Sequence, residues 1–67
     1  MKTILINETI YVLDNKIRSI SKFTASKKDN QIIFEYNDNQ RNWEHFVDKE
    51  TRDAVFDEIY TIMKEIK

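Results

Sequence analysis

The sequence predicts an α+β domain in which a small antiparallel β-meander of four or five short strands packs against one C-terminal amphipathic helix. Short runs of β-branched and aromatic residues recur along the first 47 positions, as they do in successive strands. Asn and Asp separate these runs and serve as turn residues, because the chain has no glycine or proline. The apolar residues then change to a helical spacing in the last 19 positions.

The chain is expected to form a single domain, residues 1–67, with strands at residues 3–6, 9–13, 17–23, 31–37 and 41–47. Asn7 and Glu8 form the predicted two-residue loop between the first two strands. The polar segment 24–30 is predicted to be a loop and the most mobile part of the chain. Asp38 and Asn39 are predicted to form the two-residue loop of the last hairpin, which has the strongest hairpin signal in the chain.

The position of this last loop decides which side chains share a face of the hairpin. With Asp38 and Asn39 in the loop, one face carries Ile32, Phe34, Tyr36, Arg41, Trp43 and His45. We expect this face to pack under the helix, with Arg41 stacked on Tyr36 and His45 hydrogen-bonded to the backbone at the core edge. The residues predicted to be largely buried are Phe34, Trp43, Val55, Ile59 and Ile62.

The helix is expected over residues 49–66, with Asp48 as its N-cap. Its apolar positions span about 160° of the helix surface, whereas a stripe of roughly 100° is enough to contact one sheet face. The surplus lies on one flank, made of Phe56, Tyr60 and Met63. Two interpretations remain open: a curled sheet buries this helix flank, or a second copy or a partner protein docks on it.

The composition argues against several classes of function. The chain has no cysteine and one histidine, His45, so no disulfide and no thiolate or histidine-rich metal site is expected. Without glycine it has no glycine-rich phosphate or oxyanion loop. We therefore expect a domain that is not an enzyme, with no catalytic residues, no cofactor and no metal.

Ile, Asn and Lys supply 24 of the 67 residues, a bias typical of an AT-rich genome such as that of a low-GC bacterium or its phage. No stretch approaches the ~18 apolar residues of a membrane span. The first 13 residues are too polar for a secretory signal. We therefore expect a cytoplasmic protein with no membrane contact.

A chain of this length, without a disulfide or a metal, is expected to be marginally stable unless it self-associates. We therefore expect a small protein-interaction module that forms a homo-oligomer, with a dimer favoured, or binds a host protein. The expected contact residues are Phe56, Tyr60 and Met63. In a phage or mobile element, such a protein would act as an inhibitor or regulator of its host partner.

The alternative is a domain that binds single-stranded nucleic acid on its sheet, where aromatic side chains stack on bases and basic side chains contact phosphates. Against it, Glu35 and Glu44 lie on the same strands and the net charge is −1. The residues expected to make these contacts are Tyr36, Arg41, Trp43, Lys22, Lys27 and Lys28.

Overall fold

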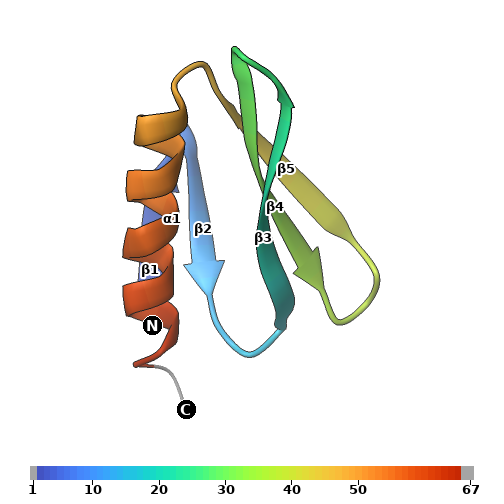
Figure 1. The fold of residues 1–67 in the computed structure, drawn as a ribbon. Helices are drawn as coiled ribbons and strands as arrows, with labels where there is room; N and C mark the ends of the chain where they lie inside the picture. The colour runs from blue at the N-terminus through green and yellow to red at the C-terminus, as the bar shows by residue number, and fades with distance from the viewer. Residues whose placement is uncertain (1, 66–67) are drawn as a thin grey trace.

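The computed structural model describes residues 2–65 and contains five antiparallel strands followed by one helix (Figure 1). The predicted α+β class is confirmed. The strands fall into two sheets: β1 pairs with β2, while β3, β4 and β5 form a three-stranded sheet in that order. The elements are β1 (Lys2–Ile6), β2 (Thr9–Leu13), β3 (Ile17–Ser26), β4 (Asp29–Tyr36), β5 (Arg41–Phe46) and α1 (Lys49–Met63).

One hydrophobic core lies between these elements. The β1–β2 hairpin and α1 stand together on one side of the three-stranded sheet (Figure 1). No part of residues 2–65 packs over the opposite side, which we call the uncovered face. Tyr11 of β2 stacks on Phe34 of β4, with ring centroids 4.3 Å apart. The buried apolar residues are Ile4, Ile6, Tyr11, Leu13, Ile17, Ile32, Phe34, Phe46 and Ile59.

The loop between β4 and β5 contains three residues, Asn37, Asp38 and Asn39, instead of the predicted two. Asn39 has a positive φ of 70°, and its N–H donates to the carbonyl of Tyr36 at 3.0 Å. The Tyr36 N–H donates to the carbonyl of Gln40 at 2.9 Å. This is a three-residue hairpin loop that ends in a left-handed residue. The extra residue shifts the pairing by one position, which turns the side chains of β5 to the opposite face.

The burial prediction is correct for Phe34 and Ile59, while Val55 and Ile62 are half-buried against the core. It is wrong for Trp43, which is 49% exposed. In the observed register, Trp43 pairs with Ile33 and therefore points to the uncovered face. The sequence pattern predicts the position of β5 correctly. Which of its side chains face the core depends on the number of residues in the preceding loop.

The same shift moves Arg41 and His45 to the uncovered face. His45 Nδ1 lies 2.8 Å from Asp29 Oδ1, in an exposed contact. Arg41 donates to Glu35 through Nε and Nη2 at 3.2 and 3.1 Å. The predicted backbone bond of His45 and the predicted stacking of Arg41 are therefore wrong. Their places on the core face are taken by Asn42, Glu44 and Phe46.

Segment 24–30, predicted to be a mobile loop, belongs to the β3–β4 hairpin. Strand β3 continues to Ser26 and β4 begins at Asp29, so that the turn consists of Lys27 and Lys28. The prediction was wrong because it relied on polarity, whereas backbone pairing places no demand on the polarity of exposed side chains.

Asn30 shows how a polar residue is accommodated within this hairpin. Its side chain is 1% exposed, and Nδ2 donates to the carbonyls of Phe46 and Val47 at 3.4 and 3.2 Å. A buried amide with hydrogen-bond partners is compatible with a sheet interior. Asn30 therefore joins β4 to the chain that leads from β5 into the helix.

Helix α1 starts after Asp48, the predicted N-cap, whose side chain makes no capping bond to a backbone N–H of the helix. The helix ends at Met63, and the last predicted helical residue lies outside the described residues. Arg52 near its start is 3% exposed and donates through Nη1 to the carbonyls of Phe23 and Gln31 at 3.1 and 3.3 Å. This side chain fixes the first turns of α1 to β3 and β4.

Candidate functional site

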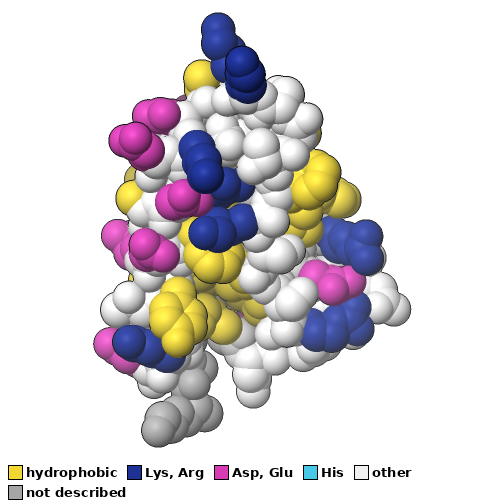
Figure 2. Space-filling model, in the orientation of Figure 1, with side chains coloured by type: hydrophobic (Ala, Val, Ile, Leu, Met, Phe, Trp, Pro, Cys, Tyr) yellow, Lys and Arg dark blue, Asp and Glu magenta, His cyan; other side chains and the backbone are white. Residues whose placement is uncertain are grey.

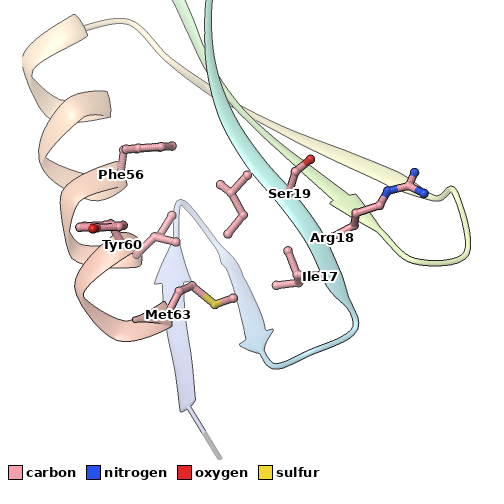
Figure 3. A pocket seen from close by; sticks show the side chains of 8 residues that line it. Ile17, Arg18, Ser19, Phe56, Tyr60 and Met63 are labelled. Carbon is pink, nitrogen blue, oxygen red and sulfur yellow. The ribbon is translucent and has the colours of Figure 1, made fainter. Parts of the chain in front are cut away.

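The helix flank predicted from the sequence lines a groove between α1 and the edge strand β3. Phe56 and Met63 extend from α1 toward β3, and Tyr60 lies beside them along the helix at the rim of the groove (Figure 3). Ile17 and Ile20 contribute to the opposite wall. The groove contains a hollow of about 210 Å³ whose walls are largely apolar.

The three flank residues are exposed to different extents. Phe56 and Met63 are half-buried and pack against the core. Tyr60 is 62% exposed. The three-stranded sheet therefore covers part of the helix flank and leaves Tyr60 at the surface beside an open groove.

A β-bulge at the start of β3 shapes the groove wall. The pairing of β3 with β4 shifts between Ile17 and Ser19, which makes Arg18 an extra residue in the strand. A bulge re-aims the side chains around it. Arg18 points away from the groove in Figure 3, and its guanidinium lies 3.0 Å from Glu35. Ile17 and Ile20, three positions apart, consequently both face the groove.

Lys22 bridges the groove wall and the helix next to Phe56. Its Nζ lies 5.1 Å from the Phe56 ring centroid and 3.6 Å from Asp53 Oδ1. A hydrogen bond from Arg52, together with the nearby charge of Lys22, holds the pKa of Asp53 below its ordinary value. This end of the groove is therefore closed by an ion pair, and the apolar part lies toward Met63.

The segment that contains β3 and the residues next to it is rich in basic side chains. Residues 15–28 contain five Lys or Arg and no Asp or Glu. Two of these bases form ion pairs with Glu35 and Asp53. In Figure 2, acidic side chains line the helix side of the molecule, and apolar ones gather between the helix and the sheet. The bases that form no ion pair within residues 2–65 are Lys16, Lys27 and Lys28.

The uncovered face of the three-stranded sheet is a second candidate surface. Phe23 on β3 is 52% exposed and Trp43 on β5 is 49% exposed. Ile33 lies between these strands on β4 and pairs with Trp43. Phe23 was missed from the sequence because the bulge at Arg18 breaks the alternation that would have placed it.

Charged pairs flank these aromatic side chains. Glu35 accepts hydrogen bonds from Arg41 and contacts Arg18, and these two guanidinium groups lower its pKa. A hydrogen bond from His45 likewise lowers the pKa of Asp29. The acids on this face are therefore ionised at neutral pH, and Glu35 is paired with two guanidinium groups.

The residues predicted to contact nucleic acid do not share one surface. Arg41 and Trp43 lie on the uncovered face. Tyr36 is half-buried against the core, and burial raises its pKa. Lys22 lies on the other side of the sheet, against the helix. The last two, Lys27 and Lys28, form the β3–β4 turn.

Glu44 anchors the β1–β2 hairpin to β5. Its Oε2 accepts a hydrogen bond from the Tyr11 hydroxyl, and its Oε1 accepts one from Asn7 Nδ2 at 2.9 Å. Burial, followed by this contact with Glu44, raises the pKa of Tyr11 well above its ordinary value. Within residues 2–65, no three His, Asp or Glu side chains come together as a metal-binding group.

No protein-family model, curated protein or solved structure matches the chain. In the described part of the chain, no helix is both long enough and apolar enough to cross a membrane.

Proposed function

We propose that the domain is a protein-interaction module whose α1–β3 groove holds an extended segment of a partner protein. The observation that carries the proposal is an apolar hollow beside a free strand edge, since β3 pairs with β4 alone among residues 2–65. An extended peptide at such an edge gains main-chain hydrogen bonds, while alternate side chains enter the neighbouring pocket.

The dimensions of the groove suit a short segment with one anchoring side chain. The hollow of about 210 Å³ is smaller than the ~300 Å³ at which small-molecule pockets begin. From Phe56 to Met63 the helix rises about 10 Å at 1.5 Å per residue. A strand covers that distance with roughly three residues. The groove therefore fits an apolar anchor with one or two residues on either side.

The basic side chains in and next to β3 indicate which partner segments are attracted to the groove. Residues 15–28 carry bases and no acids, so a segment with Asp or Glu next to its apolar anchor gains from electrostatic complementarity. The same charge disfavours a second copy at this edge, because two β3 strands side by side would bring their bases together. A different polypeptide is therefore the better occupant. By binding such a segment in its groove, the domain would act as an inhibitor or regulator of the partner protein.

Selection of a random peptide display library against the folded domain tests this proposal. We expect enriched peptides to carry a large apolar residue next to Asp or Glu. Binding should slow hydrogen exchange of β3 edge amides, because these N–H groups acquire partners. Tyr60→Glu should weaken binding at least ~10-fold, about 1.4 kcal/mol. It should leave the helical circular dichroism unchanged, because Tyr60 is already exposed.

Val47→Glu is the matched control, since Val47 is 72% exposed and does not line the groove. This variant should bind the selected peptides within about twofold of wild type, as expected for a remote surface change. If no peptide is enriched, or if the selected peptides bind Tyr60→Glu as tightly as wild type, the groove is not the docking site.

Binding of single-stranded nucleic acid on the uncovered face is a second candidate function. It is favoured by two exposed aromatic side chains, Phe23 and Trp43, on a face that also carries Arg18 and Arg41. Stacking of bases on such aromatic groups tolerates many sequences. Glu35, which neutralises part of this basic charge, weighs against it.

The fluorescence of Trp43 separates this candidate from the peptide groove. Titration with mixed-sequence single-stranded RNA at ~50 mM salt should give a saturable change that weakens steeply as salt rises, because phosphate contacts release counterions. The Trp43→Ala variant should lose most of its affinity for RNA. Because this variant lacks the tryptophan signal, its binding is measured with a fluorescent label attached outside the uncovered face. A flat titration contradicts nucleic-acid binding on this face.

A further inference from the structure

The β1–β2 hairpin carries aliphatic side chains on both of its faces. One face belongs to the core, through Ile4, Ile6, Tyr11 and Leu13. On the other face, Leu5, Ile10 and Val12 are 66%, 68% and 43% exposed. Leu5 pairs directly with Ile10, and Thr3 pairs with Val12. These four residues, Thr3, Leu5, Ile10 and Val12, form a contiguous surface that we call the outer patch.

This pattern is typical of strands that are covered on both sides. A hairpin with one solvated face alternates polar and apolar residues, whereas strands buried on both faces read as continuous apolar runs. Residues 4–6 and 10–13 are uninterrupted apolar runs. β3, in contrast, is mostly polar where it is exposed. The outer patch therefore has the composition of a contact surface.

We propose that the outer patch is the contact surface of a homodimer, in which a second copy of the chain covers it. A two-fold contact places the same surface of both subunits together. All four side chains of the outer patch are uncharged, so they meet their own copies without like-charge repulsion. The uncovered sheet face is less suited to this role, because Arg18, Glu35 and Arg41 lie on it.

A hollow beside the outer patch makes this surface concave at one edge. Ile10 and Val12 line it together with Tyr36 and Asn42, the charged Asp14 and Lys16 lie on it as well, and it measures about 460 Å³. Side chains of the second copy can enter it in addition to covering the flat hairpin. This hollow and the outer patch lie on β2, so one partner can contact both.

The size of the outer patch predicts a weak dimer. Two strands of five residues cover an area of about 17 by 10 Å. Even with the hollow, this is less than the ~800 Å² per partner of a standard interface. We therefore expect a dissociation constant between ~10 µM and ~1 mM. Association in that range stabilises a short chain by an amount that grows with the logarithm of protein concentration once this exceeds the dissociation constant.

Sedimentation equilibrium between ~10 µM and ~1 mM protein tests the proposal. The wild-type mass should rise from 8.1 kDa toward twice that value. Leu5→Lys and Ile10→Lys should each keep the mass at the monomer value, because either change would bury an unpaired charge in an apolar contact. Both side chains are exposed in the monomer, so circular dichroism at low concentration should match wild type.

Val47→Lys makes the same exchange at an exposed apolar position outside the outer patch and should dimerise like wild type. A monomeric wild type at ~1 mM, or dimers that persist in both lysine variants, would overturn the proposal. So would a dimer that is lost in Tyr60→Glu and kept in Ile10→Lys, since the contact would then lie at the groove. Ile10→Lys should still bind peptides in the groove. The proposal of peptide binding and the proposal of a dimer are therefore tested independently.

Discussion

At the scale of single residues, Arg52 links the helix to two strands through one buried side chain. Its buried guanidinium donates to Asp53 Oδ1 at 2.7 Å and to the carbonyls of Phe23 and Gln31. A planar guanidinium offers five donors in a fixed arrangement, which suits an acceptor set that spans two strands and a helix. The helix start and the β3–β4 hairpin therefore share one buried cation.

Arg52→Ala should destabilise the domain by about 3 kcal/mol or more, because it removes a charged donor and leaves two carbonyls and a carboxylate without it. Arg52→Lys should recover only part of this loss, since an ammonium group lacks the planar fork. Urea unfolding followed by circular dichroism measures both effects. A stability of Arg52→Ala within ~0.5 kcal/mol of wild type, as for an ordinary surface change, would contradict a structural role.

The candidate residues show which kinds of side-chain neighbours can be predicted from a sequence. Phe56, Tyr60 and Met63 lie together because helical periodicity alone places them on one flank. Trp43 and Arg41 depend in addition on a strand register, and the register depends on one turn residue. Helical neighbours could therefore be predicted from the sequence, whereas neighbours across strands could not.

At the scale of elements, the β4–β5 loop decides which face of β5 is buried. Its last residue, Asn39, has φ of 70°, and Asn is among the residues that tolerate this region best after glycine. Three turn residues in a row, residues 37–39, permit either a two-residue or a three-residue loop. The turn-forming residues locate the turn but do not determine how many residues the loop contains. The register was predicted wrongly for this reason.

Asn39→Ala should destabilise the domain by about 1 kcal/mol, because alanine lacks the short polar side chain that makes the left-handed region accessible to Asn and loses the hydrogen bond that Asn39 Oδ1 accepts from Arg18 at 3.0 Å. Asn39→Gly should be more stable than Asn39→Ala, since glycine adopts this geometry freely although it too loses the exposed bond from Arg18. Thermal unfolding measures both. Asn15→Ala, at an exposed turn residue without positive φ, is the control and should change little. Equal melting of Asn39→Ala and wild type would show that the left-handed residue lies elsewhere.

At the scale of the whole molecule, the fold class and the order of elements follow from the sequence, but the division into two sheets does not. Adjacent strands with short turns pair by default, and β1–β2, β3–β4 and β4–β5 all do so. The β2–β3 connection is the exception. There the chain crosses between sheets, and Tyr11 stacks on Phe34. This crossing depends on packing between distant residues, which a turn signal does not encode.

The charges of the whole molecule make its stability depend on pH in the acid range. Asp29, Glu35 and Asp53 each have a pKa below the ordinary value, because hydrogen bonds from His45, Arg41 and Arg52, respectively, favour the ionised form. The unfolded chain therefore binds protons at a higher pH than the folded chain. The stabilisation is complete above the ordinary values of 4.5 for Glu and 3.8 for Asp, and it is lost as the pH falls through the lowered values.

Glu35→Gln should make this acid destabilisation shallower, because the variant no longer has the carboxylate that lies between Arg18 and Arg41. Relative to wild type it should be less stable at pH 7, and the difference should shrink as the pH falls below the ordinary Glu value and through the lowered pKa of Glu35. Added salt should reduce the difference at pH 7, since the pairs are solvent-accessible. Thermal unfolding of both proteins from pH 2.5 to pH 7 measures the effect. Glu58→Gln, which removes an exposed helix carboxylate without an ion pair among residues 2–65, should follow the wild-type curve. If Glu35→Gln also follows it, the Arg18–Glu35–Arg41 cluster contributes nothing measurable to stability and is free to exchange partners on the uncovered face.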